Sequence, residues 1–216
     1  TVYGNDNALG RNLEFRVWDA SEYRELGFVV EDYAFQTNAA LGTPTSPVNI
    51  TATSQIIGNL TFKDGWNWFL LNLLADDMTT NGVLGGIGPA NKDIVRNQRQ
   101  FSQFVNGAGW LGNLETLSNQ SMYLINLAQP TALEIIGFAV DVELTHIPVE
   151  RGWNWISFLP QQSQAVNQAL ASLNSVSGDI IKSQFEFAQF VEGSGWIGSL
   201  TFMNPHLGYQ HFAQEA

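Results

Sequence analysis

Four of the seven tryptophans lie in two copies of one short motif, Gly-Trp-Asn-Trp, and could form an aromatic platform for sugar rings. The two tryptophans of each motif are two residues apart, which places them on one face of a β-strand. Amides that can hydrogen-bond to hydroxyl groups follow at Gln98, Gln103, Gln184 and Gln189. Because both copies keep the rings, the sequence favours a core with bonded indole N–H groups over a platform. We assign to this structural core Trp66, Trp68, Trp153, Trp155, Phe101 and Phe187.

Two further tryptophans, Trp110 and Trp196, follow the Gly-rich turns Asn-Gly-Ala-Gly and Glu-Gly-Ser-Gly. Rings beside such turns are expected to be exposed, although burial in the core stays open as the alternative. Exposed rings here would stack on carbohydrate, and the amides of Gln98 and Gln184 would bond to its hydroxyl groups. These four residues form the predicted ligand-binding site.

Asn67 and Asn154 stand between the paired tryptophans. Side chains alternate along a strand, so both amides point to the face opposite the rings. We expect each amide to be buried and to tie its strand to a nearby loop.

The sequence contains no pattern that predicts catalysis. Glycoside hydrolysis needs two carboxyl groups at a set separation. Asp76-Asp77 is the one adjacent acidic pair within the repeated part, and the second copy lacks it. There is no Ser-His-Asp order, no Gly-rich phosphate loop and no His-Glu-x-x-His motif. We therefore predict that the protein is not an enzyme.

Neither a cofactor nor a metal site is predicted. The chain has no cysteine, which excludes thiolate catalysis and Cys-ligated metals. Its three histidines, His146, His206 and His211, are too scattered for a metal site, and we expect them to face solvent.

Charge and hydropathy exclude further function classes. Nine basic and 20 acidic side chains give a formal net charge of -11 over 216 residues. No run of Lys or Arg is present that could neutralise phosphates, so the sequence predicts no nucleic-acid partner. No apolar stretch approaches the roughly 20 residues that span a bilayer, so no membrane insertion is expected. The 44% share of hydrophobic residues is that of a folded protein.

An internal duplication positions all of these residues. Residues 93–114 and 179–200 are identical at 12 of 22 positions, and a Gly-Trp-Asn-Trp motif precedes each segment at nearly the same distance. We predict three parts: a β-rich segment (1–57), repeat one (58–140) and repeat two (141–216). The first part would be a truncated β-sandwich or an N-terminal cover, with strands near 13–18, 28–30 and 48–52. The predicted fold is mainly β, with α+β character within each repeat and one short helix in each.

The elements of the repeats follow from hydrophobic periodicity. Strands are predicted at 65–74, 93–98 and 101–105, and Val166, Leu170 and Leu173 indicate a helix over about 164–175. Residues 122–127 and 132–136 are expected to pair as a hairpin. Repeat two stops before a counterpart of this last strand, which leaves an open edge that can pair with another chain. We expect the sequence to be a piece of a longer precursor.

Four motifs carry a family resemblance: GWNWIS (152–157), GDIIKSQ (178–184), FAQF (187–190) and GWIGSL (195–200). They resemble a duplicated module of large multidomain secreted proteins of Bacteroidota-type bacteria. Such modules commonly lie near the C-terminus of surface or extracellular proteins, ahead of a sorting domain. The resemblance covers nearly the whole chain and implies no catalytic residues. It implies an extracellular or cell-surface location.

Two functions remain open from sequence. The first is a non-catalytic extracellular structural or adhesive module of a larger secreted surface protein, self-associating through open β edges. Its partners would be other domains of the same precursor, neighbouring copies or surface proteins. The alternative is a carbohydrate-binding module with a polysaccharide partner, which requires exposed tryptophans.

Overall fold

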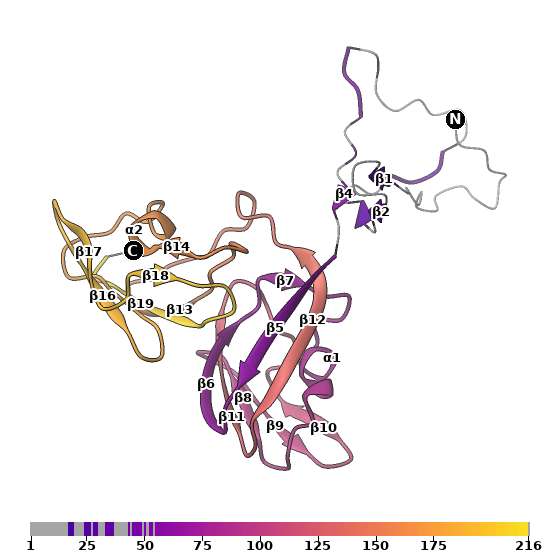
Figure 1. Ribbon diagram of the computed structural model, residues 1–216, viewed down its shortest axis with the longest axis horizontal. Helices are drawn as coiled ribbons and strands as arrows, with labels where there is room; N and C mark the ends of the chain where they lie inside the picture. The colour runs from indigo at the N-terminus through magenta and orange to yellow at the C-terminus, as the bar shows by residue number, and fades with distance from the viewer. Residues whose placement is uncertain are drawn as a thin grey trace. The chain divides into compact units, whose positions relative to one another are not determined.

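The computed structural model describes residues 55–215 and short pieces of the preceding part, namely 17–19, 24–26, 28–29, 33–36, 43, 45–48, 50 and 52–53. The chain divides into two compact units, 1–55 and 56–216. The fold is mainly β, as predicted, with antiparallel strand pairs and one short α-helix in each repeat (Figure 1).

The first unit contributes two short strand pairs to the described residues. β1 (Val17–Asp19) pairs with β2 (Arg24–Leu26), and β3 (Phe28–Val29) pairs with β4 (Ala52–Thr53). The strand predicted near 28–30 is therefore present. Most of the strand predicted near 13–18 lies outside the described residues, as does most of the proposed β-sandwich segment. The last predicted strand begins later than expected, because β4 starts at Ala52.

Repeat one contains a five-stranded antiparallel sheet in the order β10-β9-β8-β11-β6. Its strands are β6 (Gly65–Leu70), β8 (Ile94–Arg96), β9 (Phe101–Val105), β10 (Gly109–Gly112) and β11 (Met122–Leu127). The alternating side chains divide between an inner face, which includes Val95 and Ile125, and an outer face.

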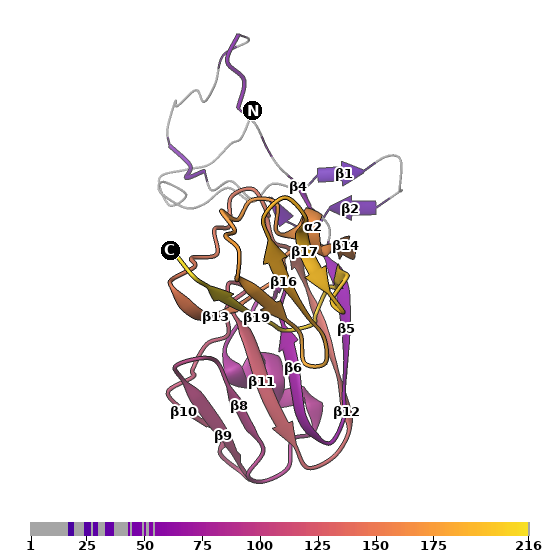
Figure 2. The ribbon, with the colours of Figure 1, turned by 90° about the vertical axis from the view of Figure 1, so that its left-hand side faces the viewer.

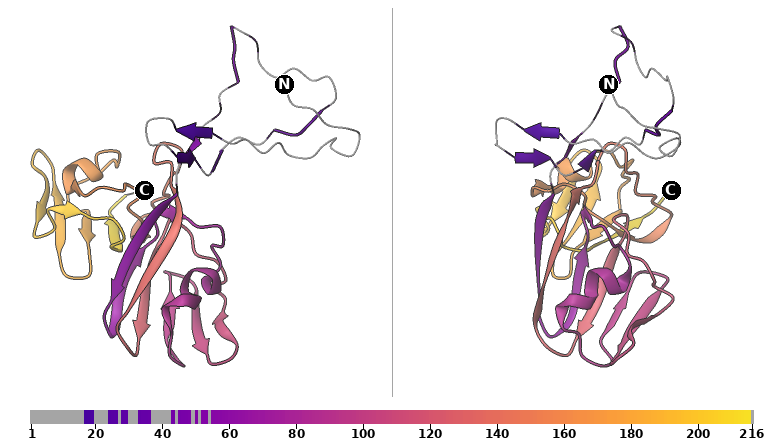
Figure 3. Two further views of the ribbon diagram at one scale, coloured as in Figure 1. Left: turned by 45° about the vertical axis from the view of Figure 1, so that its right-hand side comes forward. Right: turned by 90° about the vertical axis from the view of Figure 1, so that its right-hand side faces the viewer.

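A second layer covers the inner face of this sheet. It consists of β5 (Ile56–Phe62), β12 (Thr131–Ala139) and β7 (Leu73–Leu74), in the order β5-β12-β7. Figure 3 shows the long β5–β12 pair beside the five-stranded sheet. The predicted hairpin of 122–127 with 132–136 is wrong, because β11 pairs with β6 and β8 whereas β12 pairs with β5 and β7.

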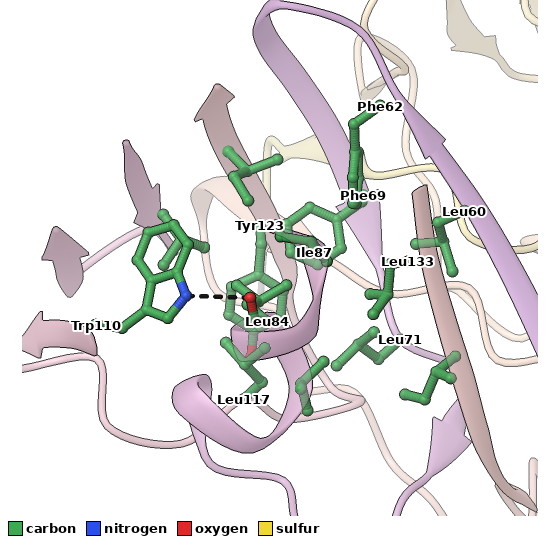
Figure 4. Close-up of a cluster of buried hydrophobic side chains, with 14 of the residues drawn as sticks. Leu60, Phe62, Phe69, Leu71, Leu84, Ile87, Trp110, Leu117, Tyr123 and Leu133 are labelled. Atoms are coloured by element: carbon green, nitrogen blue, oxygen red, sulfur yellow. Dashed lines mark hydrogen bonds between the residues drawn. The ribbon is translucent and has the colours of Figure 1, made fainter. Parts of the chain in front are cut away.

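The core of repeat one lies between the two layers. Leu60 of β5 and Leu133 of β12 face each other across the strand pair and are buried. The helix α1 (Thr80–Leu84) and the 3-10 turn η2 (Gly85–Ile87) add further apolar side chains. Figure 4 shows these groups meeting Phe69, Tyr123 and Trp110 in one cluster. An inward-facing apolar residue at every second position of β5 accounts for this packing.

Repeat two builds the same five-stranded sheet, in the order β13-β19-β15-β16-β17 (Figure 2). Its strands are β13 (Gly152–Ile156), β15 (Ile180–Lys182), β16 (Phe187–Val191), β17 (Gly195–Gly198) and β19 (Tyr209–Ala213). A small pair, β14 (Gln164–Ala165) with β18 (Phe202–Met203), lies beside helix α2 (Val166–Ala169). The helix is shorter than the predicted span of 164–175.

Repeat two differs from repeat one in its second layer. Within the described residues nothing follows β19 that corresponds to β12. The segment 143–149 occupies the sequence place of β5, yet it is not a strand. Since β5 pairs only with β12 in repeat one, a segment without that partner has no ladder to join.

Candidate functional site

The outer faces of the two five-stranded sheets carry similar side chains at most equivalent positions. In repeat one, Trp66, Ile94, Gln103 and Leu111 lie in one cross-strand row, which Asn126 of β11 completes. Five neighbouring strands span roughly 19 Å at the usual strand spacing. Repeat two has Trp153, Ile180, Gln189 and Ile197 in the corresponding row, completed by Phe212.

Phenylalanine and valine lie beside each row. Phe101 and Val105 stand two residues on either side of Gln103 and therefore share its face. Phe187 and Val191 have the same relation to Gln189. We call the six matched positions of each repeat the outer strip: Trp66, Ile94, Phe101, Gln103, Val105 and Leu111 in repeat one, and Trp153, Ile180, Phe187, Gln189, Val191 and Ile197 in repeat two.

Four residues of the outer strips were assigned to the structural core from sequence, and this assignment is wrong. Trp66 and Trp153 are 46% and 43% exposed, and Phe101 and Phe187 are each 56% exposed. Their strand registers place all four side chains on the outer face, so the core assignment is wrong for them.

Trp68 and Trp155 are the two predicted core tryptophans that are less exposed. Both are partly buried and pack against the second hydrophobic cluster of the protein. Their core assignment holds, although the packing that buries them lies between the repeats and not inside one sheet.

The expected exposure of Trp110 and Trp196 is also wrong. Their rings are 3% and 6% exposed, because the registers with Phe104 and Phe190 turn them to the inner face. The indole N–H of Trp110 donates to the carbonyl of Leu84 at 3.3 Å (Figure 4). Neither ring is available for stacking on a ligand.

Gln98 and Gln184, the other two predicted ligand-binding residues, connect the repeats. Gln98 Nε2 donates to the Trp153 carbonyl at 2.7 Å, and its Oε1 accepts from the Trp155 N–H at 3.0 Å. Gln184 repeats this arrangement in the opposite direction, with the Trp66 carbonyl at 2.8 Å and the Trp68 N–H at 3.1 Å. Each glutamine thus fills two backbone positions on the edge strand of the other repeat, and the pair is not brought together with Trp110 or Trp196.

Two cation contacts at the junction follow the same reciprocal pattern. The Arg96 guanidinium lies 5.2 Å from the ring centre of Trp155, and the equivalent Lys182 ammonium lies 5.6 Å from that of Trp68. Leu70 and Met122 of repeat one belong to the hydrophobic cluster of repeat two. The cation contacts are therefore reciprocal between the repeats, whereas the apolar contacts of Leu70 and Met122 are made in one direction only.

Two clefts of about 520 Å³ each flank the junction at equivalent places. The first is rich in amides, but Gln98, Gln100, Gln120 and Asn154 all direct hydrogen bonds to other protein atoms. The second replaces several of these polar residues by Phe185, His206 and Leu207. Because the clefts differ while the strips agree, the strips are the stronger candidate for a shared site.

The opposite edges of the two sheets are covered as well. Asn81 of α1 accepts from the Trp110 N–H at 2.7 Å and donates to the Trp110 carbonyl at 3.1 Å. Asn167 of α2 bonds to Trp196 in the same way, at 2.7 and 3.4 Å. Each five-stranded sheet therefore has one amide side chain on each of its edge strands.

The predicted asparagine ties form at both Gly-Trp-Asn-Trp motifs, but only Asn154 is buried, whereas Asn67 is partly buried. Asn67 accepts from the Lys63 N–H at 2.8 Å and donates to the Lys63 carbonyl at 2.7 Å. Asn154 makes the equivalent bonds with Glu150 at 2.8 and 2.6 Å. The amides fix the loop that leads into each edge strand.

The prediction that the histidines face solvent is wrong for His211. It is buried at the place that Ile125 occupies in repeat one, and its Nε2 lies 4.0 Å from Asp179 Oδ2. Burial lowers the pKa of His211, and the Asp179 carboxylate opposes this effect. Partial burial also lowers the pKa of His206. Because Asp179 accepts hydrogen bonds from the Val176 and Gln214 backbone, it serves the fold at this place.

One buried tyrosine in each repeat has a structural role. Tyr123 bonds through its hydroxyl to the backbone of Ser118, and Tyr209 to that of Asn204. Burial raises the pKa of Tyr209 to about 12, and that of Tyr123 also rises. Phenols with raised pKa values stay protonated and do not serve as bases near neutral pH.

In the part of the chain that the structure describes, no cluster of three or more His, Asp or Glu side chains is arranged to hold a metal ion. None of the described helices has the length and apolar run needed to span a membrane. Comparison of the chain with family models, curated proteins and solved structures finds no match.

Proposed function

We propose that this chain is a non-catalytic adhesive module of a larger secreted surface protein, and that it makes contact through its two outer strips. One observation carries the proposal: exposed apolar side chains recur at equivalent positions in both repeats. Trp66 matches Trp153, Phe101 matches Phe187, and Val105 matches Val191. Exposed apolar side chains add little to folding stability, so a fold requirement does not account for keeping them.

The exposed residues around the strips support this argument by contrast. Arg99 and Gln100 lie in the turn between β8 and β9, and they correspond to Phe185 and Glu186 between β15 and β16. In the turn between β9 and β10, Asn106 corresponds to Glu192 of repeat two. These exposed positions have diverged between the repeats, whereas the exposed apolar residues Trp66, Phe101 and Val105 recur unchanged. The outer face also has one divergent position, which is Asn126 in repeat one and Phe212 in repeat two.

Contact through the outer faces of the sheets is consistent with the hydrogen bonds that cover the backbone of their edge strands. The predicted self-association through open β edges would need free backbone groups on an edge strand. Gln98 and Gln184 cover one edge of the two sheets, and Asn81 and Asn167 cover the other. An adhesive contact therefore has more free surface on the outer strips than on the edges of the five-stranded sheets.

Adhesion is tested by coating beads with the purified chain and counting beads bound to bacterial cells and to surfaces coated with cell-envelope protein. The double variant Phe101→Ser, Phe187→Ser removes exposed rings without opening a cavity, and we expect it to reduce attachment several-fold. Ile136→Ser is the matched control, because Ile136 is equally apolar and 48% exposed but lies on β12. Equal attachment by both variants and the parent would refute the proposal.

Carbohydrate binding remains a second candidate, because each strip places a tryptophan and a glutamine in one exposed row. This site differs from the one predicted from sequence, where Trp110 and Trp196 were expected to stack. Tryptophan fluorescence titrated with a panel of polysaccharides tests it. A saturable shift that Trp66→Ala and Trp153→Ala together abolish would favour carbohydrate over protein surfaces, and the absence of any shift would exclude this candidate.

An extracellular or cell-surface location is part of the proposal. It draws on the resemblance to secreted modules and on the low share of charged residues, 13%. Labelling of intact cells with an antibody against the chain, before and after permeabilisation, tests the location directly.

A further inference from the structure

A short segment of repeat two lies along the edge strand β6 of repeat one. This segment, which we call the strap, consists of residues 204–208 and connects β18 to β19. The Leu70 N–H donates to the His206 carbonyl at 3.1 Å, and the Gly208 N–H donates to the Trp68 carbonyl at 3.4 Å. The strap therefore joins the two repeats through backbone hydrogen bonds to β6.

The side chain of His206 reaches from the strap into repeat one. A Cβ at Gly58 of β5 would lie 3.0 Å from His206 Cε1, and it would lie as close to Ile135 of β12 and Leu73 of β7. Apolar groups from all three strands of the second layer therefore meet the imidazole. Gly58 leaves room for the ring because it has no side chain.

The imidazole of His206 is placed where a proton is unfavourable. Its Nδ1 is buried and has no hydrogen-bond partner in the part of the chain that the structure describes. A protonated imidazole carries an N–H on both ring nitrogens, so protonation would bury a charged donor without an acceptor. His206 is also held at a φ of 66°, a left-handed conformation that residues other than glycine rarely adopt. Release of the strap would relieve this strain.

The charged side chains of the surrounding elements are all exposed. They are Lys63 and Asp64 between β5 and β6, Asp76 and Asp77 after β7, and Glu134 on β12. Lys63 and Asp64, which carry opposite charges, line the same cleft as His206. The strap itself contains no charged residue. Burial lowers the pKa of His206, and no described carboxylate opposes this effect as Asp179 does for His211.

The equivalent segment of repeat one carries an amide in place of the histidine. Tyr123 and Tyr209 each bond to the backbone five residues earlier, and this alignment places Gln120 where repeat two has His206. Gln120 Nε2 donates to the His146 carbonyl of repeat two at 3.1 Å. Both segments therefore join the repeats, but only the strap of repeat two does so with a group that titrates near neutral pH.

We propose that the strap is a pH-sensitive latch between the repeats, which holds β6 while His206 is neutral and releases it when His206 takes up a proton. A histidine that is harder to protonate in the folded state keeps its contacts above about pH 6.5 and loses them as the pH falls. Release frees the Leu70 N–H and the Trp68 carbonyl and opens the cleft of about 520 Å³ that His206 lines. The latch is independent of the proposed function, because the strap contains no residue of either outer strip.

Amide hydrogen exchange of the whole chain, measured by NMR and corrected for the intrinsic effect of pH, tests the latch. Between about pH 7.5 and about pH 5, protection of the Leu70 amide should fall several-fold. The Phe104 amide, which bonds to the Asp93 carbonyl in the same sheet away from the strap, should stay protected. His206→Gln, which copies the residue of repeat one, should abolish the response. His146→Gln is the matched control on an exposed histidine and should keep it.

A second variant separates the strap from the other buried histidine. In His211→Ile the fall in Leu70 protection should persist, because His211 lies on β19 and not in the strap. Unchanged protection of Leu70 in acid, an equal fall in His206→Gln, or loss of the response in His211→Ile would each overturn the proposal.

A measurement on the unaltered chain decides the matter if His206→Gln does not fold. The imidazole resonances of His206 should titrate with the same midpoint as the loss of Leu70 protection. A midpoint that differs from that of Leu70 would overturn the latch.

Discussion

Removing the glutamine bridges should loosen the junction of the two repeats. Gln184→Ala deletes two hydrogen bonds to the edge strand of repeat one, at 2.8 and 3.1 Å. Gln98→Ala deletes the equivalent pair in repeat two, at 2.7 and 3.0 Å. Because both changes open the same interface, we expect similar losses of stability from them.

The magnitude follows from the bonds that are lost. A neutral hydrogen bond contributes about 0.5–1.5 kcal/mol net, so two bonds correspond to about 1–3 kcal/mol per glutamine. Three of the four bonds are exposed to solvent, and water can replace part of each. We therefore expect about 1 kcal/mol for each single variant. The double variant should lose about 2 kcal/mol or more, since interactions in one interface are coupled.

Chemical denaturation followed by tryptophan fluorescence measures these losses. Gln184→Glu is an isosteric check, because a carboxylate can accept from the Trp68 N–H but cannot donate to the Trp66 carbonyl. It should cost at least as much as alanine. Gln103→Ala is the matched control, since this glutamine lies on the outer strip away from the junction. In the double variant the single transition should broaden or split as the repeats unfold separately.

Two results would show that the glutamine side chains do not join the repeats. Losses below about 0.3 kcal/mol for both single variants, equal to that of Gln103→Ala, would mean that the bridges do not hold the repeats together. A large loss for Gln98→Ala alone would contradict the reciprocal arrangement.

Three further changes test the burial pattern, the covered edges and the histidines. Trp110→Ala should lower the unfolding free energy by about 3–5 kcal/mol because it leaves a cavity in the core. Trp66→Ala, on the exposed face, should lower it by less than about 1 kcal/mol. Equal losses of the two variants in chemical denaturation would contradict the assigned faces. Asn81→Ala should lose about 1–2 kcal/mol through two missing bonds and increase light scattering, because it frees the backbone of β10; unchanged scattering and stability would contradict an edge-covering role. His211 has a pKa below its unfolded value, so stability should hold above about pH 6.5 and fall as the pH drops below it. His211→Ile should flatten this decline in melting temperature and leave only the part due to His206, and an unchanged pH profile would show that His211 is not the group responsible.

The strands of the repeats could be predicted because local pattern and duplication agree. The strand at residues 122–127 and the strand at 101–105 match β11 and β9 in both bounds. Their partners could not be predicted in the same way. A short connection between two apolar strands favours a hairpin, but β12 carries Leu133 and Ile135 to meet β5 in the other layer. Periodicity identifies the buried face of a strand and does not identify the sheet that covers it.

The predicted site failed at Trp110 for a related reason. A Gly-rich turn indicated exposure, yet the ring belongs to the strand that follows the turn. Its pairing with Phe104, whose ring centre lies 5.6 Å away, turns it inward. The bridging role of Gln98 was also missed, although a signal was present. Gln98 is the one residue of the turn 97–100 that recurs in repeat two, where Gln184 is flanked by different side chains.

Sorting the repeated residues by the direction of their side chains separates fold from function. Inward residues such as Trp110 recur because each core needs them, and Gln98 recurs because each repeat bridges to the other. Neither reason applies to Phe101 and Leu111, which face solvent on the outer sheet and contact neither the core cluster nor the other repeat among the described interactions. The exposed rings of Phe101 and Phe187 recur outside either core, and this recurrence is the reason for the proposed contact with a partner outside the chain. Trp66 and Trp153, which the sequence placed in the core, are exposed on the outer strips, whereas Trp110 and Trp196, which were expected to stack on carbohydrate, are buried in both repeats and serve the fold.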